Sequence, residues 1–472
     1  MQRSAVVVGS GPNGLSAAIL LAQAGIAVEV REAASMPGGA ARSGELTLPG
    51  FTHDLGSAVH PMALSSPFFN SLPLHQFGLR WIFSPAQLAH PFDDGTAVTL
   101  ERDISATAAQ LGVDGPAYCK LYESLVENWP ALFKEVFRPL VFPRRPFLLA
   151  RFGMRAVQPC TYLTRFLFLK DRARALVAGS VCHSALKLEA PLSAAFGMII
   201  GGAAHAVGWP IPEGGSQSIS NALAGVLESL GGRILTNAKV SKLDELGSPD
   251  LVLCDLTPRQ FLSIAGHRLR PSFIKLLQHF KYGPGSYKVD WALREPIPWK
   301  AKECRRAITI HLGCTLDELA ESERRPWQGR PPERPFVLLA QPSLFDASRA
   351  PAGRHTAWAY CHVPNGWAGS ALQQIENQIE RFAPGFRDCI LERAVHNTPA
   401  MESWDANLVG GDVNGGALSM GQFAFRPTWR RYGTPLRGVY LCSASTPPGG
   451  SVHGMCGYWA AKRALRYLKK LS

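Results

Sequence analysis

The residues that most directly indicate a chemistry lie near the start of the chain. They are three closely spaced glycines and one carboxylate. Gly9, Gly11 and Gly14 follow the pattern G-x-G-x-x-G, directly after a continuous apolar run over residues 5–8. Glycines at this spacing permit a tight turn, a close approach of backbone to a pyrophosphate, and close packing of a helix on the preceding strand. Glu32 closes the next apolar segment, where a carboxylate can accept hydrogen bonds from both hydroxyls of an adenosine ribose. These residues predict a dinucleotide site that disfavours a 2′-phosphate.

The elements that must position these residues are visible around them. Residues 5–8 predict a strand covered on both faces, residues 15–24 a helix that ends before Gly25, and residues 27–30 a second strand. The unit is therefore strand, glycine turn, helix and strand. Pro12 and Asn13 inside the turn, and Ala33 directly after Glu32, are expected to contact the same dinucleotide.

The stretch after Glu32 distinguishes one dinucleotide from another. Gly38, Gly39 and Arg42 follow where a nicotinamide-dependent dehydrogenase usually continues into its next strand and helix. This "GG-x-x-R-S" stretch resembles the phytoene-dehydrogenase-like FAD-dependent oxidoreductases of the amine-oxidase and carotenoid-desaturase superfamily. The resemblance implies FAD as the cofactor, with the two glycines close to its pyrophosphate.

The resemblance extends along nearly the whole chain. Residues 51–61, which include Gly56 and Ser57, are similar to the family segment that lines the flavin ring. Residues 204–223 resemble the family's return into the FAD domain, and residues 232–243 the strand whose Val240 would contact the adenine side. Residues 281–293, 383–386 and 407–412 also resemble this group.

Two departures from the family pattern concern the end of the chain and the segment after Val240. Residues 244–256 are short, so the hairpin that many relatives have there is expected to be trimmed. Amine-oxidase relatives carry a carboxylate near the ribityl chain, whereas residues 441–446 contain none. Ribityl contacts are therefore expected from backbone or from Ser443 and Ser445, which weakens the amine-oxidase alternative.

A second glycine-rich loop lies near the C-terminus. Residues 447–454 read as a loop after a strand at residues 438–445, and helical spacing begins near Met455. Gly454, Met455 and Cys456 are thus expected to form a helix N-terminus with unpaired N–H groups. In the family this end faces the flavin ring, where a positive dipole stabilises the negative charge of the reduced ring. An ordinary glycine turn is the alternative.

Four basic side chains are candidates for proton transfer. Flavin-dependent removal of hydride from carbon requires only a base, or water, for the neighbouring proton. His60 and His453 lie in stretches expected near the ring, Lys288 is an unexplained charge within an apolar strand, and His311 is a further candidate. Of these we select His60, Lys288 and His453 as catalytic. Each also has a structural alternative, and Asp290 could pair with Lys288.

A basic, apolar-rich stretch spans residues 137–174. It carries nine Arg or Lys against one acid, Asp171, interleaved with large apolar residues. Such a segment suits an anionic membrane surface. A helical cap with its charges in water is an equally good interpretation, whereas nucleic acid is a poorer match because no nucleic-acid-binding signature accompanies it.

Composition limits the remaining classes. The chain has 472 residues, of which 46% are apolar and 18% charged, with a net charge of +13. This predicts a globular protein of two domains. Ten cysteines without a C-x-x-C pair argue against a metal site or disulfide framework. No signal peptide and no transmembrane run is recognised, so we expect a cytoplasmic protein, peripheral at a membrane if the basic stretch binds lipid.

We therefore predict an α/β fold with a Rossmann-like FAD-binding domain assembled from three chain segments, interleaved with an α+β substrate domain. The FAD domain is expected over residues 1–85, 205–268 and 400–472. The substrate domain is expected over residues 86–204 and 269–399, with a helical cap.

The predicted function is an FAD-dependent oxidoreductase, desaturase-like, which transfers hydride from a C–H bond of an apolar substrate to flavin N5. Isoprenoid or carotenoid-like compounds are the candidate lipophilic substrates. No second glycine fingerprint follows a strand, so reoxidation by oxygen, quinone or another carrier is expected rather than by a pyridine nucleotide. Two alternatives stay open: a flavin amine oxidase acting on a polar small molecule, and an FAD-binding scaffold without turnover.

Overall fold

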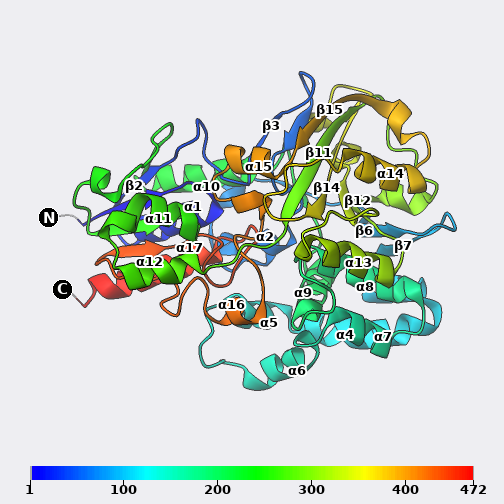
Figure 1. The fold of residues 1–472 in the computed structure, drawn as a ribbon, viewed down its shortest axis with the longest axis horizontal. Helices are drawn as coiled ribbons and strands as arrows, with labels where there is room; N and C mark the ends of the chain where they lie inside the picture. The colour runs from blue at the N-terminus through cyan, green and yellow to red at the C-terminus, as the bar shows by residue number, and fades with distance from the viewer. Residues whose placement is uncertain (1–2, 471–472) are drawn as a thin grey trace.

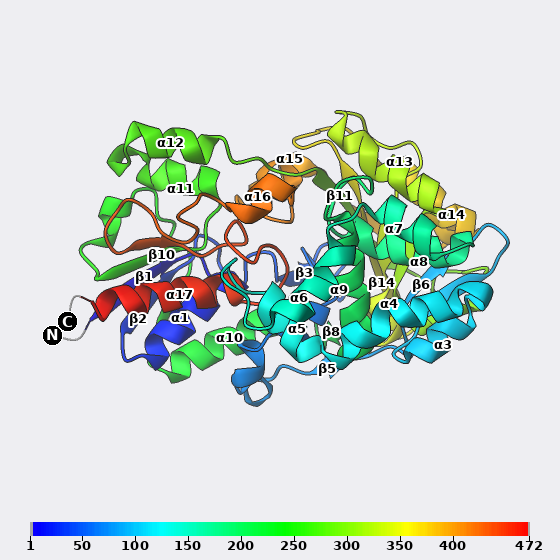
Figure 2. The ribbon, with the colours of Figure 1, turned by 90° about the horizontal axis from the view of Figure 1, so that it is seen from below.

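Two sheets lie side by side in the protein, each with its own helices (Figures 1 and 2). The structure is a computed structural model and describes residues 3–470, apart from the side chain of residue 423. The smaller sheet, with α1, α10, α11, α12 and α17 around it, lies at the left of Figure 1. The larger sheet lies at the right, and a layer of helices runs beneath it. The mixture of strands and helices is the predicted α/β class.

The smaller sheet is five-stranded and entirely parallel, in the order β16-β10-β1-β2-β9. Its members are β1 (Ser4–Val8), β2 (Ala27–Arg31), β9 (Arg233–Leu235), β10 (Leu251–Cys254) and β16 (Val439–Leu441). Three distant parts of the chain thus contribute strands. The carboxyl ends of all five strands meet at one edge, where open parallel sheets bind their ligands.

The apolar run of β1 is explained by cover on both faces. Ala5 and Val7 belong to the core that includes α1 (Pro12–Gln23) and α17 (Met455–Leu468). Val6 and Val8 belong to a separate core with α11 (Pro258–Ala265) and α12 (Pro271–Gln278). Because side chains alternate along a strand, both faces require apolar residues.

Three predicted boundaries in this region were wrong. The first helix begins at Pro12 rather than residue 15, because proline is favoured at the first helical position. The strand expected over residues 232–243 ends at Leu235, since the backbone then bends and donates from Asn237 and Ala238 to the carbonyls of Ala34 and Glu32. Asn237 has a φ of 52°, incompatible with a strand, so Val240 lies in a loop. The last strand is also shorter than predicted.

The larger sheet is seven-stranded, in the order β15-β11-β14-β13-β12-β6-β7. All neighbours are antiparallel except β6 and β12. Its members are β6 (Ala86–Pro91), β7 (Ala97–Leu100), β11 (Gly285–Leu293), β12 (Ala307–Leu312), β13 (Val337–Ala340), β14 (His355–Val363) and β15 (Ile390–His396). These strands fall within the segments predicted for the substrate domain, and those of the parallel sheet within the FAD segments. The exact domain boundaries stay predictions.

The helical layer beneath the larger sheet is formed by residues between β7 and α10. It contains α3 (Ile104–Ala109), α4 (Gly115–Glu127), α5 (Trp129–Val136), α6 (Pro146–Ala156), α7 (Cys160–Leu167), α8 (Asp171–Cys182) and α9 (Ser193–Ala206). Most of α8 and α9 is buried, whereas most of α6 is exposed or half-buried. Within residues 3–470, no helix combines the length and apolarity that crossing a bilayer requires.

The remaining elements connect the two sheets and their helices. They are β3 (Ser43–Glu45), β4 (Thr52–Asp54), α2 (Pro61–Ser65), β5 (Trp81–Ile82), β8 (Ile211–Pro212), α10 (Gln217–Ser229), α13 (Leu316–Trp327), α14 (Leu372–Phe382), α15 (Thr398–Trp404) and α16 (Met420–Ala424). Between Val240 and β10 the chain forms only a short 3-10 turn, so the hairpin after Val240 is trimmed as predicted.

Candidate functional site

A cavity of about 940 Å³ begins at the carboxyl edge of the parallel sheet and extends to the helical layer. One end is lined by the residues that directly follow β1, β2, β10 and β16. The other end is lined by α6, α9, β11 and β14. The cavity therefore extends from the parallel sheet to the larger sheet and its helices. The end at the parallel sheet has the form of a nucleotide-binding site.

The glycine turn after β1 admits no side chains. Gly9 has a φ of 97°, a conformation that favours glycine. A Cβ on Gly11 would lie 2.7 Å from Asp255 Oδ2, and one on Gly14 would lie 2.2 Å from the carbonyl oxygen of Gly9. Gly9 and Gly11 line the cavity, whereas Gly14 lies behind it and lets α1 pack on the turn.

The carboxylate of Glu32 is fixed in place at the end of β2. Its Oε2 accepts from the Ser10 backbone N–H at 2.8 Å and from Ser10 Oγ at 2.6 Å, and its Oε1 accepts from the Ala34 N–H at 2.8 Å. Glu32 and Ala33 both line the cavity. A carboxylate so oriented is suited to bind the hydroxyls of a ribose.

Asp255 is a cavity residue that the sequence analysis missed. It directly follows β10, and its Oδ2 accepts from the Gly14 N–H at 2.9 Å. Burial, with smaller contributions from the charges of Asp405 and Glu32, raises the pKa of Asp255 to about 7, although the hydrogen bond from the Gly14 N–H lowers it. An acidic residue at the carboxyl end of a buried apolar strand was the signal that could have identified it.

Gly38, Gly39 and Arg42 form a second turn against the first. Gly39 has a φ of 53° and a Cβ there would lie 3.1 Å from the Gly11 Cα. The Arg42 guanidinium donates to the carbonyls of Gly39 and Trp404 and lies 4.9 Å from the centre of the Trp404 ring. Gly39 and Arg42 line the cavity; Gly38 does not.

Several buried polar atoms on the cavity wall have no hydrogen-bond partner among the described residues. They include Asn13 Oδ1, Ser57 Oγ and Trp404 Nε1, and also Ser286 Oγ on β11 and Trp358 Nε1 on β14 at the opposite end. A buried polar atom without a partner is costly, so these atoms indicate that a ligand supplies the missing partners. Together with the open N-terminus of α1 and the Glu32 carboxylate, the atoms of Asn13, Ser57 and Trp404 fit FAD bound along the sheet edge.

The C-terminal loop contacts the cavity through different residues from those predicted. Pro448, Gly450, Ser451 and Val452 line the wall, whereas Gly454, Met455 and Cys456 do not. The Met455 N–H, expected to be free, donates to His453 Nδ1 at 3.0 Å. A Cβ on Gly454 would lie 2.1 Å from Ser16 Oγ, because α17 packs directly on α1.

Of the remaining residues predicted to bind the cofactor, some line the cavity and one does not. Gly56, Ser57, Val240 and Ser443 line the cavity, as do Pro12 and Asn13. Ser445 is buried behind the wall, where its Oγ donates to the Gly415 carbonyl at 2.7 Å. These contacts to the cofactor stay predictions for each residue.

Of the three catalytic candidates, His60 and Lys288 line the cavity and His453 does not. His453 Nδ1 accepts from the backbone at the start of α17, and its ring lies edge-on to Phe137. His60 Nε2 lies 2.8 Å from Ser216 Oγ, which itself donates to the Ser57 carbonyl. Burial lowers the pKa of His60 to about 4, so the ring is neutral at neutral pH. His311, the fourth basic residue considered, is buried against His183 outside this wall.

Lys288 belongs to a buried polar cluster on β11. Its ammonium group pairs with Asp290, as the sequence analysis considered, and lies 5.9 Å from the centre of the Trp358 ring. His53 and His396 each approach an Asp290 oxygen to 3.6 Å. Burial raises the pKa of Asp290 to about 6 although the charge of Lys288 lowers it. Lys288 thus brings an ionisable group, with its counterion behind it, to the cavity wall.

Comparison with known proteins agrees with this site. Residues 7–71 match the family described as the NAD(P)-binding Rossmann-like domain. The chain is 26% identical to the Mus musculus pyridine nucleotide-disulfide oxidoreductase domain-containing protein 2, over 99% of this chain and 94% of that protein. It is 25% identical to the lycopene-forming phytoene desaturase of Pseudescherichia vulneris, over 96% of each. A solved putrescine oxidase variant superposes with a TM-score of 0.63 at 16% identity, covering 100% of this chain and 99% of its own.

The sheet, its glycine turn and these relatives together indicate the class of protein. The sequence relatives are oxidoreductases, and the findings support an FAD-dependent oxidoreductase of the superfamily that contains the amine oxidases and the carotenoid desaturases. Identities of about a quarter support that class and do not name a substrate.

Proposed function

We propose that the protein is an FAD-dependent dehydrogenase that removes hydride from a C–H bond of an apolar substrate. The observation that carries the proposal is the apolar wall of the cavity beyond the nucleotide end. It is formed by Val59, Met62, Val136, Phe137, Leu149, Phe152, Ala156, Val157, Leu192, Ala195, Phe196, Ile199 and Ile200. A pocket with such a wall favours a ligand that buries apolar surface.

The distribution of acidic residues supports an apolar substrate over an amine. Four acidic residues line the cavity, and Glu32, Asp255 and Asp405 belong to the nucleotide end. The fourth, Glu135, accepts from the Arg138 side chain and from the Arg144 N–H. A buried ammonium group requires a free counterion, and the apolar wall offers none.

Bound FAD supplies the acceptor for the hydride, which leaves the substrate carbon with both electrons of the C–H bond. Formation of a double bond also requires loss of a proton from the adjacent carbon. The Lys288–Asp290 pair is placed to take that proton at the wall: the Lys288 ammonium passes a proton to Asp290 behind it, and the amine so formed accepts the substrate proton. The stacked rings of Trp358 and Tyr360 bound the same region and restrict water there.

The decisive experiment is anaerobic mixing of the purified holoenzyme with panels of polyenes and of aliphatic amines, followed by flavin absorbance. We expect bleaching by an apolar polyene and none by amines. Bleaching by amines alone would assign the amine-oxidase alternative, and bleaching by no compound would favour the scaffold.

A cavity-filling variant sharpens this experiment. Ala195→Phe narrows the apolar end and should lower the rate of reduction by long substrates about tenfold, with less effect on short ones. Ala109→Phe, at the end of α3 and outside the cavity lining, is the matched control. Equal losses for long and short substrates in Ala195→Phe would contradict the assignment of this wall to the substrate.

A further inference from the structure

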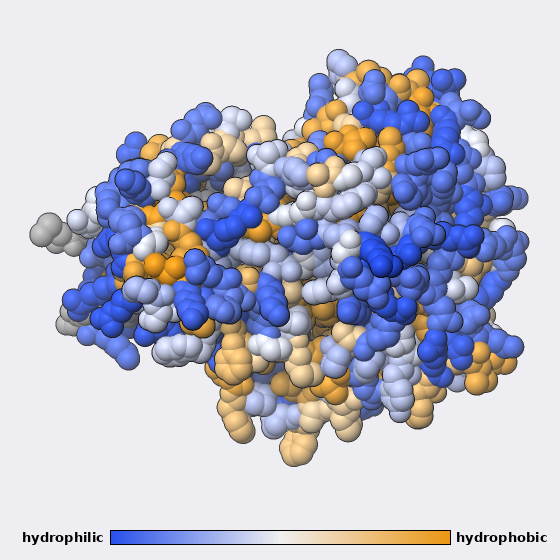
Figure 3. All heavy atoms as spheres, viewed as in Figure 1, coloured by the Kyte–Doolittle hydropathy of each residue, from blue (hydrophilic) through white to orange (hydrophobic). Residues whose placement is uncertain are grey.

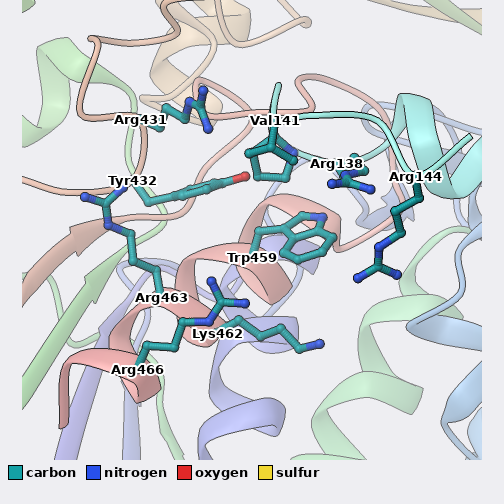
Figure 4. Close-up of a pocket in the computed structure, with 10 residues that line it drawn as sticks. Arg138, Val141, Arg144, Arg431, Tyr432, Trp459, Lys462, Arg463 and Arg466 are labelled. Atoms are coloured by element: carbon teal, nitrogen blue, oxygen red, sulfur yellow. The ribbon is translucent and has the colours of Figure 1, made fainter. Parts of the chain in front are cut away.

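A second hollow of about 330 Å³ lies outside the cavity, between the loop before α6 and the outer face of α17 (Figure 4). Arg138, Val141 and Arg144 line it from the loop, and Arg431 and Tyr432 from the segment before β16. Trp459, Lys462, Arg463 and Arg466 line it from α17. Its side chains come from three distant segments, as the close-up shows.

The hollow gathers positive charge without matching negative charge. Six of its side chains are cationic, and none is acidic. Arg138 pairs with Glu135, but the other five form no ion pair with a carboxylate of residues 3–470. Like charges held together repel one another, and an anion bound among them removes that repulsion.

The walls of the hollow are held by specific contacts. The Arg431 guanidinium donates to the Leu140 carbonyl, and Arg463 Nη1 donates to the Arg430 carbonyl at 3.0 Å. Trp459 Nε1 donates to the Phe137 carbonyl at 3.0 Å, and Lys462 Nζ lies 5.6 Å from the Trp459 ring centre. Hydrogen bonds to the main chain therefore hold Arg431 and Arg463 at the hollow.

Exposed apolar side chains border the hollow. Phe142 and Phe147 are 88% and 90% exposed, and Val141, which also lines the hollow, is half exposed. Apolar side chains protrude over the loop and α6 along the lower edge of Figure 3. The loop and α6 segment contains three further exposed apolar side chains, Leu140, Met154 and Val157. An apolar protrusion beside cations is the pattern of an anionic membrane interface.

The same loop and helix also form the outer wall of the substrate cavity. Leu140, Leu149, Phe152 and Val157 line the cavity, and Leu140 and Val157 are exposed as well. The mouth of the apolar end therefore lies next to the apolar protrusion. A lipophilic molecule dissolved in a bilayer would reach the cavity without crossing water.

We propose that the hollow binds the phosphate of an anionic lipid headgroup while Leu140–Phe142 and α6 insert into the lipid. This site goes beyond the proposed function, and its occupancy does not depend on which substrate the enzyme oxidises. The basic side chains contact the headgroup, and the apolar protrusion contacts the acyl chains. Docking in this orientation presents the cavity mouth to the membrane.

The test is flotation of the holoenzyme with phosphatidylcholine vesicles, with and without added phosphatidylglycerol. We expect binding that requires phosphatidylglycerol and weakens as salt is raised. The double variant Lys462→Gln/Arg466→Gln should lower vesicle affinity about tenfold. The matched control Arg270→Gln/Lys275→Gln removes the same charge from α12 and the residue before it, on the opposite face of the parallel sheet. Equal losses in the two variants would overturn the headgroup site.

Two further measurements separate the headgroup from other anions and from misfolding. Phe142→Ser/Phe147→Ser should weaken vesicle binding while leaving the hollow's response to inorganic phosphate, measured by thermal shift, unchanged. A protein that binds inorganic phosphate or RNA but floats with neither vesicle overturns the lipid assignment. Flavin content and circular dichroism, unchanged in every variant, show that the fold is retained.

Discussion

The two ends of the large cavity are built in different ways. The nucleotide end consists of backbone, glycines and fixed carboxylates, where contacts such as Gly14 against Gly9 leave no room for one carbon atom. The substrate end consists mainly of apolar side chains from α6 and α9 and the aromatic rings of β14. The shape of the nucleotide end depends on backbone geometry. The shape of the substrate end depends on which side chains point into the cavity. Substitutions at the nucleotide end should therefore abolish cofactor binding, whereas substitutions at the substrate end should change the reaction rate by degrees.

The largest expected effect is loss of the cofactor in Gly14→Val. The added side chain would collide with the Gly9 carbonyl and with Asp255, so α1 could not pack on the turn. We expect protein with less than about a tenth of the wild-type flavin content, since closely packed backbone cannot relax. Gly266→Ala is the control, because its Cβ would meet nothing within 4 Å. Full flavin occupancy in Gly14→Val would show that the two ends do not differ as described.

A smaller effect is expected at Lys288, the polar residue of the substrate end. Lys288→Met keeps the length of the side chain and removes the group that pairs with Asp290. The rate of anaerobic flavin reduction should fall by about a hundredfold with flavin content unchanged. Stopped-flow absorbance measures this rate, and Lys302→Met on the surface provides the control. A variant that reduces its flavin at the wild-type rate would remove Lys288 from the chemistry.

The smallest effect concerns the pH dependence of stability through Asp255. Its pKa of about 7 in the folded cofactor-free protein lies above the ordinary value of 3.8. Between these values the unfolded chain releases the proton and the folded protein retains it. The contribution of Asp255 to stability is therefore present at low pH and is lost as pH rises toward 7, by at most about 1.4 kcal/mol per pH unit.

Asp255→Asn removes this contribution while keeping an acceptor for the Gly14 N–H. Urea unfolding of the apoprotein at pH 5 and pH 7 should show that the wild type loses stability relative to the variant as pH rises. Asp388→Asn, at an exposed position, should leave that difference unchanged. Parallel pH profiles for wild type and Asp255→Asn would show that Asp255 is ionised in the folded protein.

The contrast between the two ends also explains what the sequence could predict. Gly9, Gly11, Gly14 and Glu32 lie within one local unit whose spacing reflects its geometry, so the nucleotide end was predictable. Lys288 was recognisable as a charge within an apolar strand. The position of Asp255 after an apolar strand is a local signal for the sheet edge, but its contact with the Gly14 N–H spans 241 residues of sequence and is not encoded locally.

The C-terminal loop shows where family resemblance and local pattern were insufficient. The start of α17 was predicted correctly, but its N–H groups were expected at the ring. The side chain of His453 satisfies Met455 instead, and the preceding loop faces the cavity. The periodicity of apolar residues predicts where a helix begins. It does not predict side-chain conformations, and these decide which atom accepts a hydrogen bond from each N–H at the start of the helix.

The contact between α17 and α1 has a consequence for how the protein matures in the cell. A Cβ on Gly457 would lie 1.8 Å from the Asn13 carbonyl, so the first and last helices touch backbone to backbone. β16, the strand that precedes α17, completes the edge of the parallel sheet beside β10. The nascent chain therefore cannot complete its cofactor site until β16 and α17 have left the ribosome. Cofactor loading is a late event, and a ribosome that stalls before residue 455 releases a chain unable to retain its flavin.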